Sequence, residues 1–211
     1  MKPMRSAGLI LAGGQARRLG GRDKALVELG GKTLVAHVHA RLARQTAPVL
    51  ISAAGDLTRF ANLAPAATLA DDLPGFQGPL AGILAGLDWL ARAAPAVTHM
   101  LSLPVDTPFA PEDLAQRLQG ARVVGADVPA SACHGGRLHP AVTLWPLALR
   151  HALRSMVEQE NIRAVTKALL RLDGVSVAFD HLKDDPFFNI NSPDDLARAQ
   201  ALLAGRSGFD D

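Results

Sequence analysis

The stretch at residues 8–24 combines an apolar run, paired glycines and a group of cations. Residues 9–11 predict a buried strand, and Gly13-Gly14 can adopt backbone angles that a Cβ forbids, so that peptide N–H groups converge on an anion. Through Lys24 the chain holds six Lys or Arg residues and one acid, Asp23, whereas the net charge of the whole chain is only +2. This local excess predicts that the loop binds an anionic group such as a triphosphate.

A Gly-Gly pair after a strand can also be an ordinary tight turn beside a solvated cationic face. A strand, a glycine turn and four cations in so short a window favour phosphate binding over that simpler interpretation. The four cations are Arg17, Arg18, Arg22 and Lys24. The loop is neither of two common phosphate motifs, because Gly-x-Gly-x-x-Gly is absent and Gly31-Lys32-Thr33 has Leu26 where a P-loop needs glycine.

Apolar runs alternate with helical patterns along the chain. Strands are expected at residues 7–11, 49–53, 97–103, 122–128, 141–145 and 175–179. Helices are expected at residues 33–45, 79–94, 111–119, 147–158, 161–172 and 193–203. This alternation predicts an α/β fold, a single Rossmann-like domain over residues 1–211 with a mostly parallel central sheet and helices on both faces. Such sheets bind ligands at the carboxyl ends of their strands.

Asp106 follows the expected strand at residues 97–103. We therefore expect it at the same sheet edge as the Gly13-Gly14 loop. A carboxylate there can hold Mg²⁺, which keeps several waters and takes phosphate oxygens as further ligands. Asp106 could instead be a turn residue, because Asp-Thr-Pro often opens a loop. We predict Asp106 as the metal ligand and Mg²⁺ as the cofactor.

The composition is typical of a globular protein, since 48% of the 211 residues are hydrophobic and 20% are charged. No apolar run reaches the roughly 18 residues that a membrane span needs, and the N-terminus lacks the pattern of a secretory signal. The single cysteine, Cys133, has no partner in the chain for a disulfide or a structural zinc site. We expect a cytoplasmic monomer with no membrane partner.

Nucleic-acid binding and a histidine metal site are both disfavoured. The basic cluster is compact, only 4% of the residues are aromatic and tyrosine is absent, so no stacking platform is indicated. His37 and His39 are two positions apart on an expected helix and therefore point to different faces.

The N-terminal stretch resembles the start of the nucleotidyltransferases that attach a nucleotide to a phosphorylated small molecule. Leu11-Ala-Gly-Gly14, Arg18-Leu-Gly-Gly21 and Asp23-Lys24 follow the pattern of that family in order. The ending Gly20-Gly-Arg-Asp-Lys24 is most similar to the molybdenum cofactor guanylyltransferases, which join GMP from GTP to molybdopterin. Later blocks resemble the same family in order and spacing: Gly78-Pro-Leu-Ala-Gly82, Leu103-Pro-Val-Asp-Thr-Pro108, Leu138-His-Pro-Ala141 and Phe188-Asn-Ile-Asn-Ser-Pro193.

The resemblance implies that the N-terminal part binds GTP and that Lys24, Arg18 and Asp106 carry the reaction. The nucleotide-binding residues that it implies are Leu11, Ala12, Gly13, Gly14, Lys24, Ser52, Asp71 and Asp106. The Asp71 carboxylate suits guanine because it can accept hydrogen bonds from adjacent N–H donors. Asp72 could make this contact in place of Asp71, or the two carboxylates could be a solvated pair with no ligand. Ser52 stands where the guanylyltransferases often have asparagine, which leaves the base preference open.

The resemblance also implies that the C-terminal part binds molybdopterin. The substrate-binding residues that it implies are Gly78, Gly82, His139, Asn189 and Asn191. In an extended chain, Asn189 and Asn191 present both amides on one face, where they can give and accept hydrogen bonds with a pterin. A helix-capping role for Asn-Ser-Pro and a structural role for His139 fit the same residues. Transient contact with cofactor-insertion proteins or molybdoenzymes is the protein partnership implied.

The expected mechanism needs no covalent nucleophile, and the sequence shows no Gly-x-Ser-x-Gly elbow. A terminal phosphate, with a second pKa near ~6, is already largely an anion at neutral pH, so that positioning and electrostatics remain as the work of the protein. Three further functions stay open: transfer from CTP to molybdopterin, transfer from an NTP to a sugar phosphate, and a regulatory module that binds nucleotide without turnover. The presence of both Lys24 and Asp106 argues against the last.

Overall fold

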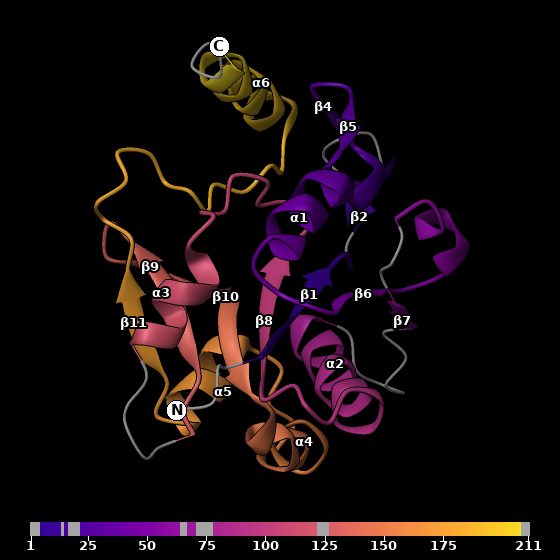
Figure 1. The fold of residues 1–211 in the computed structure, drawn as a ribbon, viewed down its shortest axis with the longest axis vertical. Helices are drawn as coiled ribbons and strands as arrows, with labels where there is room; N and C mark the ends of the chain where they lie inside the picture. The colour runs from indigo at the N-terminus through magenta and orange to yellow at the C-terminus, as the bar shows by residue number, and fades with distance from the viewer. Residues whose placement is uncertain are drawn as a thin grey trace.

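A seven-stranded sheet lies at the centre of the computed structural model, which describes residues 5–13, 15–16, 22–63, 67–70, 78–121 and 127–207 (Figure 1). The strand order is β11-β9-β10-β8-β1-β6-β7. The strands are β1 (Ser6–Leu11), β6 (Val49–Ala53), β7 (Ala67–Ala70), β8 (His99–Pro104), β9 (Ala130–His134), β10 (Arg137–Pro146) and β11 (Val175–Ala178). Only β10 is antiparallel to its neighbours, β8 and β9, among the described pairs of this sheet. The predicted α/β fold with a mostly parallel sheet is confirmed.

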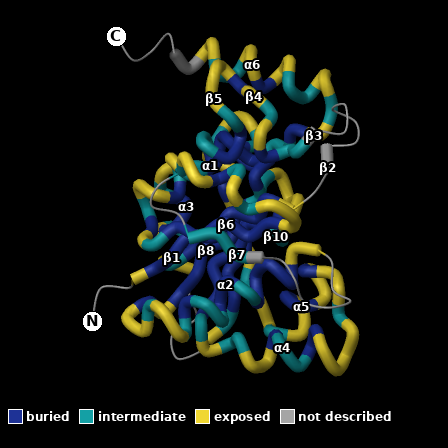
Figure 2. The backbone as a smooth tube through the Cα atoms, turned by 90° about the vertical axis from the view of Figure 1, so that its right-hand side faces the viewer, coloured by how far each residue is buried: buried dark blue, intermediate teal, exposed yellow. Residues whose placement is uncertain are grey.

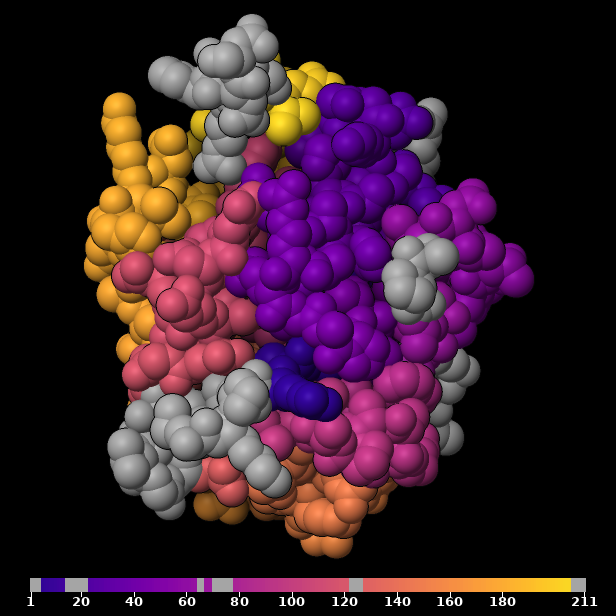
Figure 3. Space-filling view, in the orientation of Figure 1, coloured from indigo at the N-terminus to yellow at the C-terminus, as the bar shows by residue number. Residues whose placement is uncertain are grey.

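Helices cover both faces of the sheet, as the alternation of side chains along β1 requires. The helices are α1 (Leu34–Ala43), α2 (Pro79–Ala93), α3 (Leu114–Gly120), α4 (Arg150–Glu158), α5 (Val165–Arg171) and α6 (Pro193–Ser207). Ile10 packs with apolar residues of α1 and α3, whereas Leu9 and Leu11 pack with those of α2, α4 and α5. Figure 2 shows the central strands β1, β6 and β8 as largely buried, and Figure 3 shows α1 and its neighbours (violet) covering the front.

No helix in the described part of the chain is both long and apolar enough to span a membrane.

Some elements differ from the sequence prediction. The expected helix at residues 161–172 begins later, at Val165, because Asn161 has a φ of 54° in the left-handed region and Ala164 has extended backbone. The expected strand at residues 122–128 falls largely outside the described residues, and 127–128 are not in a strand. The pattern did not indicate β7 or β9, because both are short and rich in alanine, which has a low strand propensity.

Helix α6 lies beyond the carboxyl end of β8, next to the small hairpin of β4 (Glu28–Leu29) and β5 (Lys32–Thr33) (Figure 1). The hairpin turn contains Gly30, which has a φ of 56°. A Cβ at Gly30 would lie only 2.4 Å from Leu203 Cδ2 of α6. Glycine therefore permits both the turn and the close approach of the C-terminal helix to this end of the molecule.

Helix α2 packs closely on the ends of β6 and β1 through Gly82. A Cβ at this position would lie 2.5 Å from Ser52 Oγ and 3.2 Å from Leu11 Cδ2. Ser52 and Leu11 pair across β6 and β1. The absent side chain of Gly82 thus lets α2 approach the carboxyl edge of the sheet.

We expect Gly82→Ala to lower the free energy of unfolding by about 1–3 kcal/mol, because the added methyl group forces Ser52 and Leu11 to move. Urea denaturation measures the change. The matched control is Gly205→Ala in α6, where a Cβ meets nothing within 4 Å. That change should raise stability by up to ~1 kcal/mol through helix propensity. Equal effects of the two substitutions would contradict the close packing at Gly82.

Candidate active site

Asp106 lies in the turn that follows β8, beside the end of β1. Val105 N donates to Leu11 O at 3.1 Å, which joins this turn to the strand before the glycine loop. Thr107 closes the turn, since its hydroxyl donates to Pro104 O at 2.7 Å. Asp106 is buried, with 8% of its surface exposed. The structure therefore places Asp106 at the sheet edge beside the loop, as the sequence predicts.

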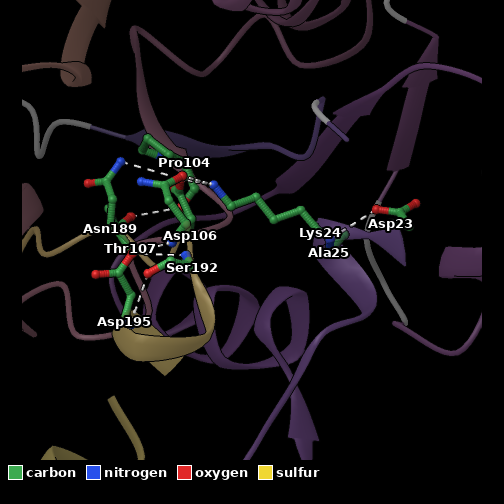
Figure 4. A network of polar contacts seen from close by, with 10 residues as sticks. Asp23, Lys24, Ala25, Pro104, Asp106, Thr107, Asn189, Ser192 and Asp195 are labelled. Atoms are coloured by element: carbon green, nitrogen blue, oxygen red, sulfur yellow. Dashed lines mark hydrogen bonds and ion pairs between the residues drawn. The ribbon is translucent and has the colours of Figure 1, made fainter. Parts of the chain in front are cut away.

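Lys24 reaches this carboxylate from the N-terminal region. It begins the short 3-10 helix η2 (Lys24–Leu26), which Asp23 caps by accepting a 2.9 Å hydrogen bond from Ala25 N. Lys24 Nζ lies 2.5 Å from Asp106 Oδ2, and both side chains are largely buried (Figure 4). The same ammonium donates to Asn191 Oδ1 at 2.5 Å. One cation thus joins the N-terminal turn, the end of β8 and the C-terminal segment.

The Asn-Ile-Asn segment lies against Asp106. Asn189 Nδ2 donates to Asp106 Oδ2 at 3.3 Å, and Ile190 N donates to Asp106 O at 3.1 Å. One polar cluster therefore joins different parts of the chain. It contains Lys24, Asp106, Asn189 and Asn191, and Figure 4 labels the first three.

Asp195 holds the asparagine segment at the start of α6. Its Oδ2 accepts hydrogen bonds from Asn191 N at 3.0 Å and Ser192 N at 2.9 Å, while Ser192 Oγ accepts from Asp195 N at 3.2 Å. These donors, first of all Asn191 N–H, hold the pKa of the Asp195 carboxyl below its usual value. The sequence analysis did not single out Asp195, although Ser-x-x-Asp before a helix is a capping-box pattern that could have revealed it.

The two carboxylate oxygens of Asp106 have unequal surroundings. Oδ2 contacts Lys24 and Asn189, whereas Oδ1 is buried and has no hydrogen-bond partner among the described residues. A buried carboxylate oxygen without a partner is unfavourable unless a cation or donor satisfies it. No group of three or more His, Cys, Asp or Glu suited to a metal occurs in the described part of the chain. In the described part of the chain, a metal at Oδ1 would therefore have Asp106 as its carboxylate ligand, with water and substrate oxygens as further ligands.

The glycine loop begins where β1 ends. Ala12 is buried and its N–H donates to Ser52 O at 2.8 Å, so this amide is already engaged. Gly13 is exposed and is the first loop residue that an anion can reach. Among the described loop residues, the Ala12 amide is therefore not free to bind phosphate, whereas Gly13 is exposed. Gly14 and Arg18 lie outside the described residues.

Ser52 does not present its side chain at the surface. It is 1% exposed, and its Oγ has no hydrogen-bond partner among the described residues. Its carbonyl supports Ala12, and its side chain packs against Gly82. Gly78 is exposed and is the N-cap residue before α2, with a φ of 125°. Asp71 lies outside the described residues, so the structure does not bear on a contact between Asp71 and a base.

His139 lies apart from the contacts of Lys24. Its ring packs on Phe187, with the ring centroids 5.0 Å apart, and its Nε2 is 3.6 Å from Asp185 Oδ1. Burial lowers the pKa of the imidazole below its ordinary value, and the Asp185 charge opposes that shift only in part. His139 therefore packs against the segment that leads to Asn189.

The charges and hydrogen-bond donors of this cluster are suited to binding a polyphosphate rather than to covalent catalysis. Lys24 supplies a positive charge, Gly13 lies at the start of the loop, and Asp106 Oδ1 can bind a cation. Such groups neutralise developing negative charge and orient phosphates.

Comparisons with known proteins identify the family of the chain. The profile of the MobA-like NTP transferase domain matches residues 8–175. The molybdenum cofactor guanylyltransferase of Bradyrhizobium sp. is 47% identical, over 93% of this chain and 92% of that protein. The enzyme of the same name from Rhodopseudomonas palustris is also 47% identical, over 92% and 90%.

Solved structures show the same fold. Molybdopterin-guanine dinucleotide biosynthesis protein A from Archaeoglobus fulgidus superimposes with a TM-score of 0.75 at 25% identity, covering 94% of this chain and 99% of that one. The family profile spans most of the chain, and the sequence relatives match nearly its full length. The protein therefore belongs to the molybdenum cofactor guanylyltransferase family of nucleotidyltransferases.

Proposed function

We propose that the protein transfers GMP from GTP to the terminal phosphate of molybdopterin, giving molybdopterin guanine dinucleotide and pyrophosphate. The observation that carries the proposal is the contact of Lys24 Nζ with both Asp106 and Asn191. This contact joins Lys24 and Asp106, which are predicted for the nucleotide, to Asn191, which is predicted for the pterin, and so supports a reaction between the two substrates. The names of the sequence relatives support guanylyl transfer to molybdopterin over transfer from CTP or transfer to a sugar phosphate.

In this proposal the N-terminal part holds the triphosphate. Lys24 and Arg18 contact phosphate oxygens, and the amides of Gly13 and Gly14 add donors. Asp106 holds Mg²⁺ through Oδ1, the buried oxygen that lacks a partner among the described residues. When bound, Mg²⁺ supplies positive charge that stabilises the departing pyrophosphate. Asp71 is the proposed contact of the guanine base.

The C-terminal part holds the acceptor. Asn189 and Asn191 present amide groups beside Asp106, so a pterin that binds them brings its phosphate close to the nucleotide. That phosphate is largely ionised at neutral pH and attacks without a strong protein base. The contribution of the protein is to align the acceptor with the α-phosphorus and to neutralise charge. Gly78, Gly82 and His139 act in this proposal by shaping the surrounding elements.

We expect pyrophosphate release and dinucleotide formation with molybdopterin and Mg²⁺ to be selective for GTP over CTP and ATP. The measurement compares kcat/KM for the three nucleotides. A preference for CTP would retain the reaction and overturn the base assignment. Binding of GTP without turnover of any acceptor would instead indicate a nucleotide-binding regulatory module.

Lys24→Ala and Asp106→Asn should each lower kcat about 10²- to 10³-fold, because each removes a charge that the transition state needs. Steady-state kinetics give the loss, and thermal unfolding checks that both variants stay folded. Lys32→Ala and Asp194→Asn are matched controls at exposed positions and should retain turnover. Near-normal turnover of either site variant would remove that residue from the mechanism.

Asn189→Ala and Asn191→Ala should raise the KM for molybdopterin about fivefold or more, since each loses a hydrogen bond worth roughly 1 kcal/mol. Kinetics with each substrate varied in turn separate this effect from a change in the KM for GTP. Asn62→Ala, in an exposed turn, serves as the control. A rise confined to the KM for GTP would reassign the asparagines to the nucleotide.

A further inference from the structure

Asp23 places a negative charge beside the proposed triphosphate site. Its backbone pairs with that of Gln15, two positions after Gly13. Its Oδ1 caps η2 by accepting from Ala25 N at 2.9 Å, and this cap orients the turn that carries Lys24. The carboxylate is therefore useful to the turn, although its charge repels a polyphosphate.

Arg59 neutralises that charge from a distant part of the sequence. It lies in the 3-10 helix η3 (Leu57–Phe60), and its Nε is 2.6 Å from Asp23 Oδ2. The two side chains are only 20% and 25% exposed. An ion pair shielded in this way is screened by water less than a fully exposed pair, and its charges matter more to a neighbouring ligand.

The guanidinium of Arg59 is held in place by the loop after β6. It donates to Ala54 O at 2.9 Å and also to Asp56 O, and it lies 4.5 Å from the centre of the Phe60 ring. These contacts fix Arg59 before any ligand binds, which limits the conformational entropy that the ion pair costs.

We infer that Arg59 is a positioning residue for the anion site, acting through Asp23. It cancels the charge of the Asp23 carboxylate while leaving Oδ1 free to cap η2, so Lys24 stays oriented and the site stays cationic. This inference rests on the proposed function, because it takes the site to hold the triphosphate of GTP. Neither Arg59 nor a partner for Asp23 could be identified from the sequence pattern.

The test measures binding of Mg²⁺–GTP and of inorganic tripolyphosphate by isothermal titration calorimetry on the full chain. Arg59→Gln should raise both dissociation constants about five- to tenfold, because the Asp23 charge is then uncompensated. The increase should shrink at high salt. Arg44→Gln is the control, because Arg44 also forms an ion pair, with Glu112 at 2.5 Å. Arg44 lies far from the site, since Ala47, three residues later, donates its N–H to Ser6 O at the opposite end of β1.

A second substitution separates charge compensation from a merely structural role. Asp23→Asn keeps an oxygen for the cap of η2 and removes the charge. In the Arg59→Gln background it should restore both dissociation constants to within about twofold of the wild-type values, whereas Asp23→Ala, which loses the cap, should not. Thermal unfolding confirms that each variant is folded.

The outcomes distinguish the two proposals. Unchanged tripolyphosphate binding in Arg59→Gln, or weakened binding that Asp23→Asn does not restore, would overturn the role of Arg59. If the wild-type protein binds tripolyphosphate but neither binds nor uses GTP, the proposed function fails. The loss and rescue of tripolyphosphate binding would still support Arg59 in that case.

Discussion

The ion pair of Lys24 and Asp106 is the constraint on which the arrangement of the site depends. Asp106 is fixed at the end of a buried strand, and Lys24 arrives on a short turn after the glycine loop. Their 2.5 Å contact joins the turn that carries Lys24 to the carboxyl edge of the sheet. Because both side chains are largely buried, the loss of either partner would leave a charge without compensation in a poorly solvated place.

Opposite charges at this site occur in near-neutral pairs. Lys24 is balanced by Asp106, and Asp23 by Arg59. The protein can therefore fold with several ionised groups close together, and the cost of their desolvation is offset by their mutual attraction. In the proposed function, a bound polyphosphate would change this balance, since it would compete with Asp106 for Lys24. A cation at Asp106 Oδ1 is then the natural compensation for the carboxylate that Lys24 leaves.

The sequence predicted those parts of the site that follow from regular structure. Asp106 could be placed near the end of β1 because parallel strands bring their carboxyl ends to one edge, and Val105 N does donate to Leu11 O there. The contact of Asn191 with Lys24 did not follow from periodicity, because irregular chain precedes α6. The ion pair of Arg59 with Asp23 could not be predicted for the same reason, since neither residue lies on an element with a clear hydrophobic periodicity.

Periodicity also could not show which atoms of Ser52 and Ala12 are accessible to a ligand. Ser52 is next to the loop, as its position at the end of a strand requires. Its side chain is nevertheless buried against Gly82, and this contact depends on where α2 lies. Ala12 is in the glycine motif, but its N–H is taken by Ser52 O. A motif thus specifies which residues meet, whereas the neighbouring element decides which of their atoms remain available to a ligand. At this edge, Gly13 is accessible because it is exposed, whereas Asp106 Oδ1 is buried and has no hydrogen-bond partner among the described residues.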